Sequence, residues 1–161
     1  MRFPFVILIL ISLLTGCTNI GDTLPDFETT TIDGTLVTDK QYEGKLLVIN
    51  IWATWCGPCI REIKALNSLV DKYKYNDDVV FIAITDESNY KVKNLLKSQP
   101  FNYTQIAEAK LLKHKLHPGI VKSIPFHIII GKDGLTKFEY TGTREDIKDF
   151  LSAEIDKALS E

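Results

Sequence analysis

Two cysteines separated by two residues are the side chains of this sequence best suited to chemistry. Cys56 and Cys59 enclose Gly57 and Pro58 and directly follow Trp55. Cysteines three positions apart at the start of a helix lie on the same side of it, about one turn apart. Their sulfur atoms can close a small disulfide ring, and so short a loop gains little stability from the cross-link. The pair is therefore expected to do redox chemistry rather than to reinforce the fold.

The position of the pair distinguishes the two thiols. Unpaired amides and the positive end of the helix dipole favour a thiolate at the first cysteine, so Cys56 is the expected nucleophile. Cys59 lies inside the first turn, where it is better shielded, and suits the resolving role. Pro58 is tolerated between them because first-turn amides have no partner within the helix.

Alternating strand and helix patterns must position this pair. Apolar runs over 46–53 and 79–85 are typical of strands buried on both faces of a parallel sheet. Asp33-Gly34 predicts a hairpin within 27–37. The other expected elements are strands over 101–107, 126–130 and 137–141 and helices over 58–73, 90–96, 110–116 and 144–159. This order indicates an α/β fold, with a mixed central sheet flanked by helices and an N-terminal β-hairpin extension.

Composition indicates one ordinary globular domain and excludes several classes of protein. The 161 residues are 45% hydrophobic and 25% charged, and the formal net charge of -2 gives no basic footprint for nucleic acid. Three cysteines are too few for a disulfide-stapled scaffold, and the odd number leaves one of them for another task.

The N-terminal segment has the pattern of an export signal. Residues 3–14 are apolar apart from Ser12 and follow Arg2. This run is too short to span a bilayer and is typical of a secretory signal peptide. It ends in Leu14-Thr15-Gly16-Cys17, which resembles the bacterial lipoprotein box and implies that Cys17 becomes the lipidated first residue.

These features predict three parts of the chain: a signal peptide over 1–16, a tether over 17–23 and a domain over 24–161. Two acyl chains on Cys17 would be enough for stable attachment to a membrane. The domain is therefore expected outside the cytoplasm, in the cell envelope, and at the periplasmic face in a Gram-negative organism.

The residues around the cysteine pair resemble those of a known family. Trp55-Cys56-Gly57-Pro58-Cys59 is similar to the active-site motif of the thioredoxin-like family, and the chain looks most like its extracytoplasmic TlpA/ResA-like thiol-disulfide reductases. The other segments that carry the resemblance are Leu24-Pro25-Asp26-Phe27, Asp33-Gly34, Gly44-Lys45, Asn50, Glu62, Ile124-Pro125 and Lys132-Asp133-Gly134. The resemblance implies a thioredoxin fold.

The resemblance also implies roles for single residues. Pro125 matches the family's cis-proline opposite the cysteine pair, and Ile124 would then expose backbone groups to an extended substrate. Glu62 resembles the acidic residue that assists proton transfer at the resolving thiol; the alternative is a first-turn carboxylate stabilised by the helix dipole. Trp55 is expected to shield Cys56 and contact substrate, or else to be a half-buried packing residue.

Three positions depart from the wider family. Asn50 stands where cytoplasmic thioredoxins have a buried Asp, and Phe126 and His127 replace the Thr common after the cis-proline. Substrate preference therefore stays open at this point.

Together these features predict a lipid-anchored thiol-disulfide oxidoreductase of the cell envelope, and the Gly57-Pro58 spacer favours a reductase. Its expected partners are disulfide-containing envelope proteins, cytochrome c precursors among them, and a membrane thiol that donates electrons. The cysteine pair carries both electrons, so no dissociable cofactor is needed, and a monomer is expected.

Two alternatives use the same cysteines without redox turnover. Cys56 and Cys59 with His114 and His117 would supply four zinc ligands, or a site for copper delivery to an envelope oxidase. A surface lipoprotein with a purely structural Cys56–Cys59 bond is the other alternative. Pro and Gly within the cysteine pair fit redox chemistry better than metal binding, and no metal is expected.

Overall fold

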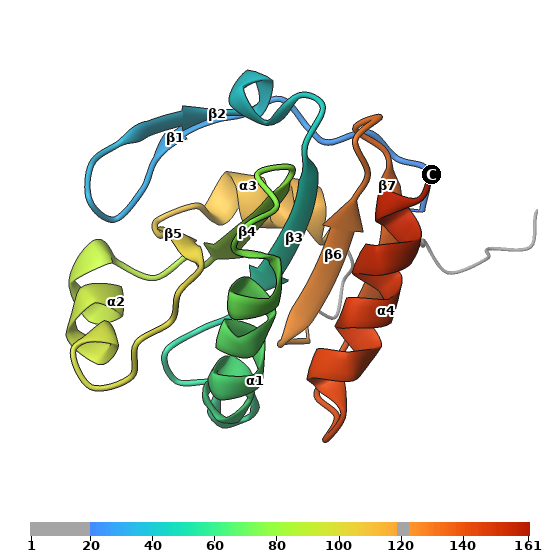
Figure 1. Cartoon of the computed structure of the whole chain (residues 1–161). Helices are drawn as coiled ribbons and strands as arrows, with labels where there is room; N and C mark the ends of the chain where they lie inside the picture. The colour runs from blue at the N-terminus through green and yellow to red at the C-terminus, as the bar shows by residue number, and fades with distance from the viewer. Residues whose placement is uncertain (1–19, 119–122) are drawn as a thin grey trace, which may run out of the picture.

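A five-stranded mixed sheet with helices on both faces forms the body of the protein (Figure 1). The computed structural model describes residues 20–118 and 123–161, so the signal peptide and Cys17 lie outside the described residues. In sheet order, the strands are β5 (Thr104–Ile106), β4 (Val79–Ile84), β3 (Leu46–Ile51), β6 (Phe126–Ile130) and β7 (Thr136–Thr141). This is the thioredoxin fold that the sequence predicts.

The composition of β3 explains why it is the middle strand of the sheet. All six residues of β3 are buried, and they are apolar on both faces apart from Asn50. Such a strand is stable only between two covering layers. β3 pairs parallel with β4 and antiparallel with β6, so strands from both halves of the chain meet along it.

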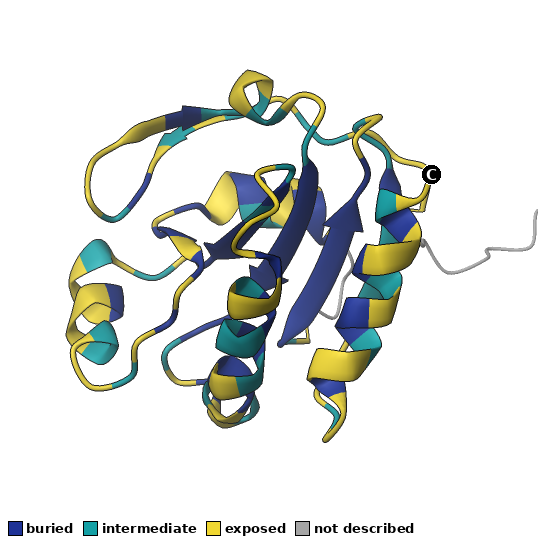
Figure 2. Cartoon of the chain, in the orientation of Figure 1, coloured by how far each residue is buried: buried dark blue, intermediate teal, exposed yellow. Residues whose placement is uncertain are grey.

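Two hydrophobic cores lie on opposite faces of the sheet. On one face pack α1 (Gly57–Tyr73) and α4 (Ile147–Leu159), together with Val92 of α2 (Asn89–Leu96). On the other face pack α3 (Lys110–Leu116) and Val37 of the N-terminal hairpin. Figure 2 shows the strands as a buried layer between helices whose outer sides are exposed. Side chains alternate along each strand, so even-numbered residues of β3 face α1 and odd-numbered ones face α3.

The predicted hairpin extension is confirmed. β1 (Glu28–Thr30) and β2 (Leu36–Thr38) pair antiparallel in a separate sheet, and the short 3₁₀ helix η1 (Asp39–Tyr42) follows. Gly34 takes a φ of +85° in the turn, a conformation in which a residue without a Cβ is unstrained.

The predicted tether is partly folded onto the body. The amide of Gly21 donates to the carbonyl of Thr136, and the amide of Leu24 donates to that of Gly134. Thr23 forms a bridge with Leu135. The folded part therefore begins near Gly21 rather than at residue 24.

Two element boundaries differ from the sequence prediction by three residues. The strand expected over 101–107 is only β5, because Phe101 and Tyr103 turn their rings into an aromatic cluster with Phe81. The helix expected from residue 144 begins at Ile147, after a segment in which Arg144 forms an ion pair with Asp146. Within the described ranges, no helix is both long and apolar enough to cross a membrane.

Candidate active site

The cysteine pair lies at the junction of β3 and α1. Cys56 is the N-cap of α1, and its Sγ forms a disulfide of 2.03 Å with Cys59. The backbone amide of Cys59 donates to the Cys56 sulfur at 3.2 Å, as it would to a capping hydroxyl. The first sulfur therefore lies where free amides and the helix dipole stabilise negative charge.

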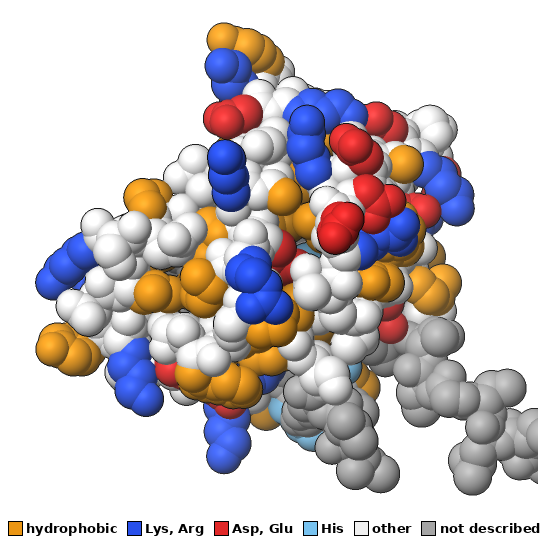
Figure 3. Space-filling model, turned by 90° about the horizontal axis from the view of Figure 1, so that it is seen from below, with side chains coloured by type: hydrophobic (Ala, Val, Ile, Leu, Met, Phe, Trp, Pro, Cys, Tyr) orange, Lys and Arg blue, Asp and Glu red, His pale blue; other side chains and the backbone are white. Residues whose placement is uncertain are grey.

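The surroundings of the pair make one side of it accessible. Cys56 is 5% exposed and Cys59 is 1% exposed, so the second sulfur is the better shielded. Trp55 is 73% exposed, which excludes the expectation that it is a half-buried packing residue. Gly57 is exposed and Pro58 is half-buried. In Figure 3, which views the molecule from the end where α1 begins, hydrophobic side chains lie on the surface between separate Lys and Arg side chains.

The proline opposite the cysteines has the expected geometry. The Ile124–Pro125 peptide bond is cis. Pro125 is buried, its carbonyl accepts from the amide of Gly142, and the carbonyl oxygen of Ile124 lies 3.8 Å from the Sγ of Cys56. The backbone next to the reactive sulfur is thus on the accessible side of the site, where an extended segment can pair with it.

The loop that carries Trp55 and Cys56 is held by a residue that the sequence analysis missed. Glu87, which follows β4, accepts from the amide of Thr54 at 2.5 Å and from its hydroxyl at 2.8 Å. Lys91, one helical turn further, lies 3.9 Å from the same carboxylate. No local pattern links positions 54 and 87, so only the fold reveals the contact.

Glu62 lies beneath the cysteines in the interior. It is the sixth residue of α1 and 4% exposed, so it is not the first-turn carboxylate that the dipole alternative requires. Its Oε1 accepts from Asn50 Nδ2 at 3.3 Å and lies 3.4 Å from His127 Nε2. Asn50 and His127 face each other across β3 and β6. These three residues form what we call the buried polar cluster.

Glu62 also influences the buried hydroxyl of Tyr103. Burial raises the pKa of the Tyr103 hydroxyl well above its usual value, and the negative charge of Glu62 raises this pKa further. Tyr103 therefore stays uncharged, with its hydroxyl as a potential donor next to the cluster.

The histidines proposed as metal ligands lie elsewhere. The ring of His117 stacks on Phe126 with 3.9 Å between ring centroids, in the core on the α3 face. Cys56 and Cys59 belong to the core on the α1 face. Over residues 20–118 and 123–161, no group of three or more His, Cys, Asp or Glu side chains is arranged to hold a metal ion.

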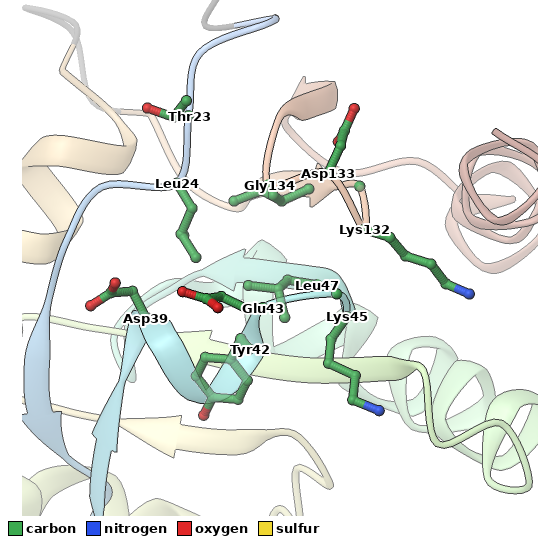
Figure 4. A pocket seen from close by; sticks show the side chains of 13 residues that line it. Thr23, Leu24, Asp39, Tyr42, Glu43, Lys45, Leu47, Lys132, Asp133 and Gly134 are labelled. Atoms are coloured by element: carbon green, nitrogen blue, oxygen red, sulfur yellow. The ribbon is translucent and has the colours of Figure 1, made fainter.

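A pocket of about 260 Å³ lies at the opposite end of the sheet, where β3 begins and β6 ends (Figure 4). Its charged side chains are largely paired with neighbours: Lys45 and Lys132 contact Asp78, and Asp133 contacts Lys137. Asp39 accepts from the amide of Phe27. These pairings make the pocket a part of the scaffold, and the reactive groups lie at the other end.

Comparison with known proteins covers most of the chain. Residues 20–139 match the AhpC/TSA family. The thiol-disulfide oxidoreductase ResA of Bacillus anthracis is 31% identical over 134 residues, which span 82% of this chain and 76% of that protein. ResA of Bacillus thuringiensis is 29% identical over 136 residues, with the same coverage. A Chlorobium tepidum structure, proposed to be a thiol:disulfide interchange protein DsbE, has a TM-score of 0.77 at 26% identity and covers 89% of this chain and 99% of its own.

We expect the two thiols of the reduced protein to differ in reactivity. Iodoacetamide at pH 7 should label Cys56 roughly ten times faster than Cys59, because the first sulfur caps the helix and is the more exposed of the two. Timed quenching followed by fragment-ion mass spectrometry measures both rates. In urea the two rates should become similar; equal rates in the folded protein would contradict the assignment.

Proposed function

The chain belongs to the AhpC/TSA family and is a thiol-disulfide oxidoreductase, and on this premise we propose that it reduces protein disulfides in the cell envelope while anchored to a membrane by lipid. One observation carries the redox assignment. The Cys56–Cys59 disulfide caps α1 beside the carbonyl of Ile124, so the reactive sulfur and the backbone that would align a substrate lie together.

The proposed reaction has two exchange steps. In the reduced protein the Cys56 thiolate attacks a substrate disulfide, and one substrate sulfur leaves as a thiolate. Cys59 then attacks the Sγ of Cys56, restores the disulfide of this protein and releases the second substrate sulfur. Exposed Trp55 and the backbone of Ile124 would contact the substrate on either side of the mixed disulfide.

The direction of electron flow follows from the spacer between the cysteines. Gly57-Pro58 resembles the spacer of reducing thioredoxins, which supports a reductase. A reductase outside the cytoplasm needs a source of electrons, which we assign to a membrane thiol. Its clients would be envelope proteins with disulfides, including cytochrome c precursors whose haem-binding thiols must stay reduced.

We expect replacement of the two cysteines to block different steps of the reaction. Cys56→Ser should abolish reduction of insulin disulfides, because no nucleophile remains to form the mixed disulfide. Cys59→Ser should accumulate mixed disulfides, visible as shifted bands on non-reducing gels. Cys17→Ser is the matched control and should retain turnover in detergent. Retained turnover in Cys56→Ser would refute the mechanism.

The reduction potential of the Cys56–Cys59 couple decides the direction. For a reductase we expect a value close to the roughly -270 mV of thioredoxin. Equilibration with glutathione or dithiothreitol buffers, followed by alkylation of free thiols, measures it. A value near the roughly -120 mV of DsbA would instead show an oxidant.

Anchoring depends on Cys17 alone in this proposal. Cys17→Ser removes the site of acylation, so the protein should move from the membrane fraction to the soluble envelope fraction, since a lost pair of acyl chains removes stable attachment. Fractionation with immunoblotting detects the change, and Cys59→Ser is the control that should stay with the membrane. A Cys17→Ser protein that remains in the membrane fraction would show a different anchor.

A further inference from the structure

The buried polar cluster contains a residue to which the proposed reaction gives no role. Asn50, Glu62 and His127 are each at most 4% exposed, and they lie between α1 and the strands β3 and β6. A carboxylate in such a place is costly unless donors surround it. Two groups approach its Oε1, the amide of Asn50 at 3.3 Å and the Nε2 of His127 at 3.4 Å.

Asn50 determines which nitrogen of His127 carries the proton. The Nδ2 of Asn50 lies 3.3 Å from the Nδ1 of His127 and 3.3 Å from Glu62 Oε1. An amide nitrogen only donates, so Nδ1 must accept, and the ring proton of a neutral imidazole is then on Nε2. The reversed amide would turn its oxygen toward the carboxylate and leave two acceptors facing each other. In this arrangement Nδ1 accepts from Asn50, and Nε2 is the ring nitrogen that lies next to Glu62.

This contact is electrostatic in the oxidised protein. The 3.4 Å separation between Nε2 and Oε1 is close, but its alignment falls short of a hydrogen bond. Contacts of this kind are often long in resting structures and shorten in the reacting complex.

The resolving step needs a base at this position. Once the protein is reduced, Cys59 has a thiol that is shielded from solvent and must lose its proton before it can attack. Glu62 follows Cys59 by three residues on α1, and helical side chains tilt toward the N-terminus, so the carboxylate lies beneath the thiol. Glu62 Oε2 has no hydrogen-bond partner among the described residues, so this oxygen is available to take a proton.

We propose that His127 is a positioning residue of the resolving step, which lies against Oε1 of Glu62 and so leaves Oε2 free to accept the proton of Cys59. This inference rests on the proposed function. In the mixed disulfide, the Cys59 proton moves to Oε2 and the Cys59 thiolate attacks Cys56 Sγ. The Cys56–Cys59 bond forms, the bond from Cys56 to the substrate breaks, and the substrate sulfur leaves with the electron pair. The proton then passes from Glu62 to the leaving thiolate or to solvent.

A pocket beside the cluster gives the proton a route to solvent. It has a volume of about 330 Å³ and lies between α1 and the turn before α4. Its walls are formed by Arg61, Glu62, Ala65, Thr143, Arg144, Glu145 and Ile147. Glu62 thus lines this pocket, while its Oε2 is buried within the protein.

The other titratable groups near the cluster come from four elements. α1 contributes Arg61 and the cysteines, and the turn before α4 contributes Arg144 and Glu145. Tyr103 lies before β5, and the ring of Tyr140 in β7 stacks 6.2 Å from that of His127. Arg144 is paired with Asp146, whereas Asn50 donates to the Glu62 carboxylate and the Nε2 of His127 lies 3.4 Å from it.

A stepwise thiol assay isolates the resolving step. The full chain with Cys17→Ser has only Cys56 and Cys59, and each releases one thiopyridone from 4,4′-dithiodipyridine. The first phase reports attack by Cys56 and the second reports attack by Cys59 on the mixed disulfide. In His127→Leu we expect the first phase to be unchanged and the second phase to be roughly 10- to 100-fold slower. This is less than the loss expected when the general base itself is removed, because Glu62 is still present.

Two amide variants distinguish this role from simple packing. His127→Gln places an amide N–H near the position of Nε2 and should restore the wild-type rate of the second phase. His127→Asn carries the same amide at the position of Nδ1, too short to reach Glu62, and should behave like His127→Leu. Equal behaviour of the Gln and Asn variants would overturn the inference.

A double-mutant comparison keeps the test valid if His127→Leu folds poorly. In a Glu62→Gln background, which has no base to support, His127→Asn should cause no further slowing of the second phase. An equal further slowing there would overturn the inference. If the wild type shows no second phase at all, the proposed function itself fails, whereas a normal wild type with unaffected His127 variants refutes only the role of His127.

Discussion

The antiparallel pairing of β6 with β3 is the constraint on which the site depends. β3 leads through a short loop to Cys56, and β6 begins directly after Pro125. Their register sets Ile51 opposite Phe126 and Asn50 opposite His127, and so brings the Ile124 carbonyl to 3.8 Å from the Cys56 sulfur. A shift of one residue would turn His127 to the α3 face and separate it from Glu62. One strand pair thus fixes both the outer and the inner side of the redox centre.

The two sides of the centre have opposite physical requirements. On the outer side Trp55 and Gly57 are exposed, and a backbone carbonyl lies beside the sulfur. On the inner side the buried carboxyl group of Glu62 needs polar neighbours that are fixed in place. The strands supply these neighbours, because the sheet sets the directions of their side chains, whereas Glu87 holds the loop that carries Trp55. The two sides are therefore built by different elements of the fold.

Local patterns predicted much of the fold and, within the site, the cysteine pair at the start of α1. The buried strands, the hairpin at Gly34 and the helix that starts after Cys56 follow from periodicity and turn residues, and the structure confirms them. The cis bond before Pro125 was implied by the family resemblance alone, and the structure confirms it too. The sequence left two alternatives open that concern burial, and the structure excludes one of each pair. Trp55 is exposed and not a half-buried packing residue, and Glu62 lies in the second turn, not the first. Burial depends on which elements pack over a residue, and a one-dimensional pattern does not contain that information.

The sequence by itself determined the reacting atoms, because two cysteines at a helix start, with Gly and Pro between them, make a redox pair through local geometry alone. Only the tertiary structure decided what surrounds those atoms. The contacts from Thr54 to Glu87, from Asn50 to Glu62 and from Asn50 to His127 join residues 12 to 77 positions apart. Such contacts form only when long loops close and strands pair in one register, so the partners of the cysteines are properties of the fold and not of the motif.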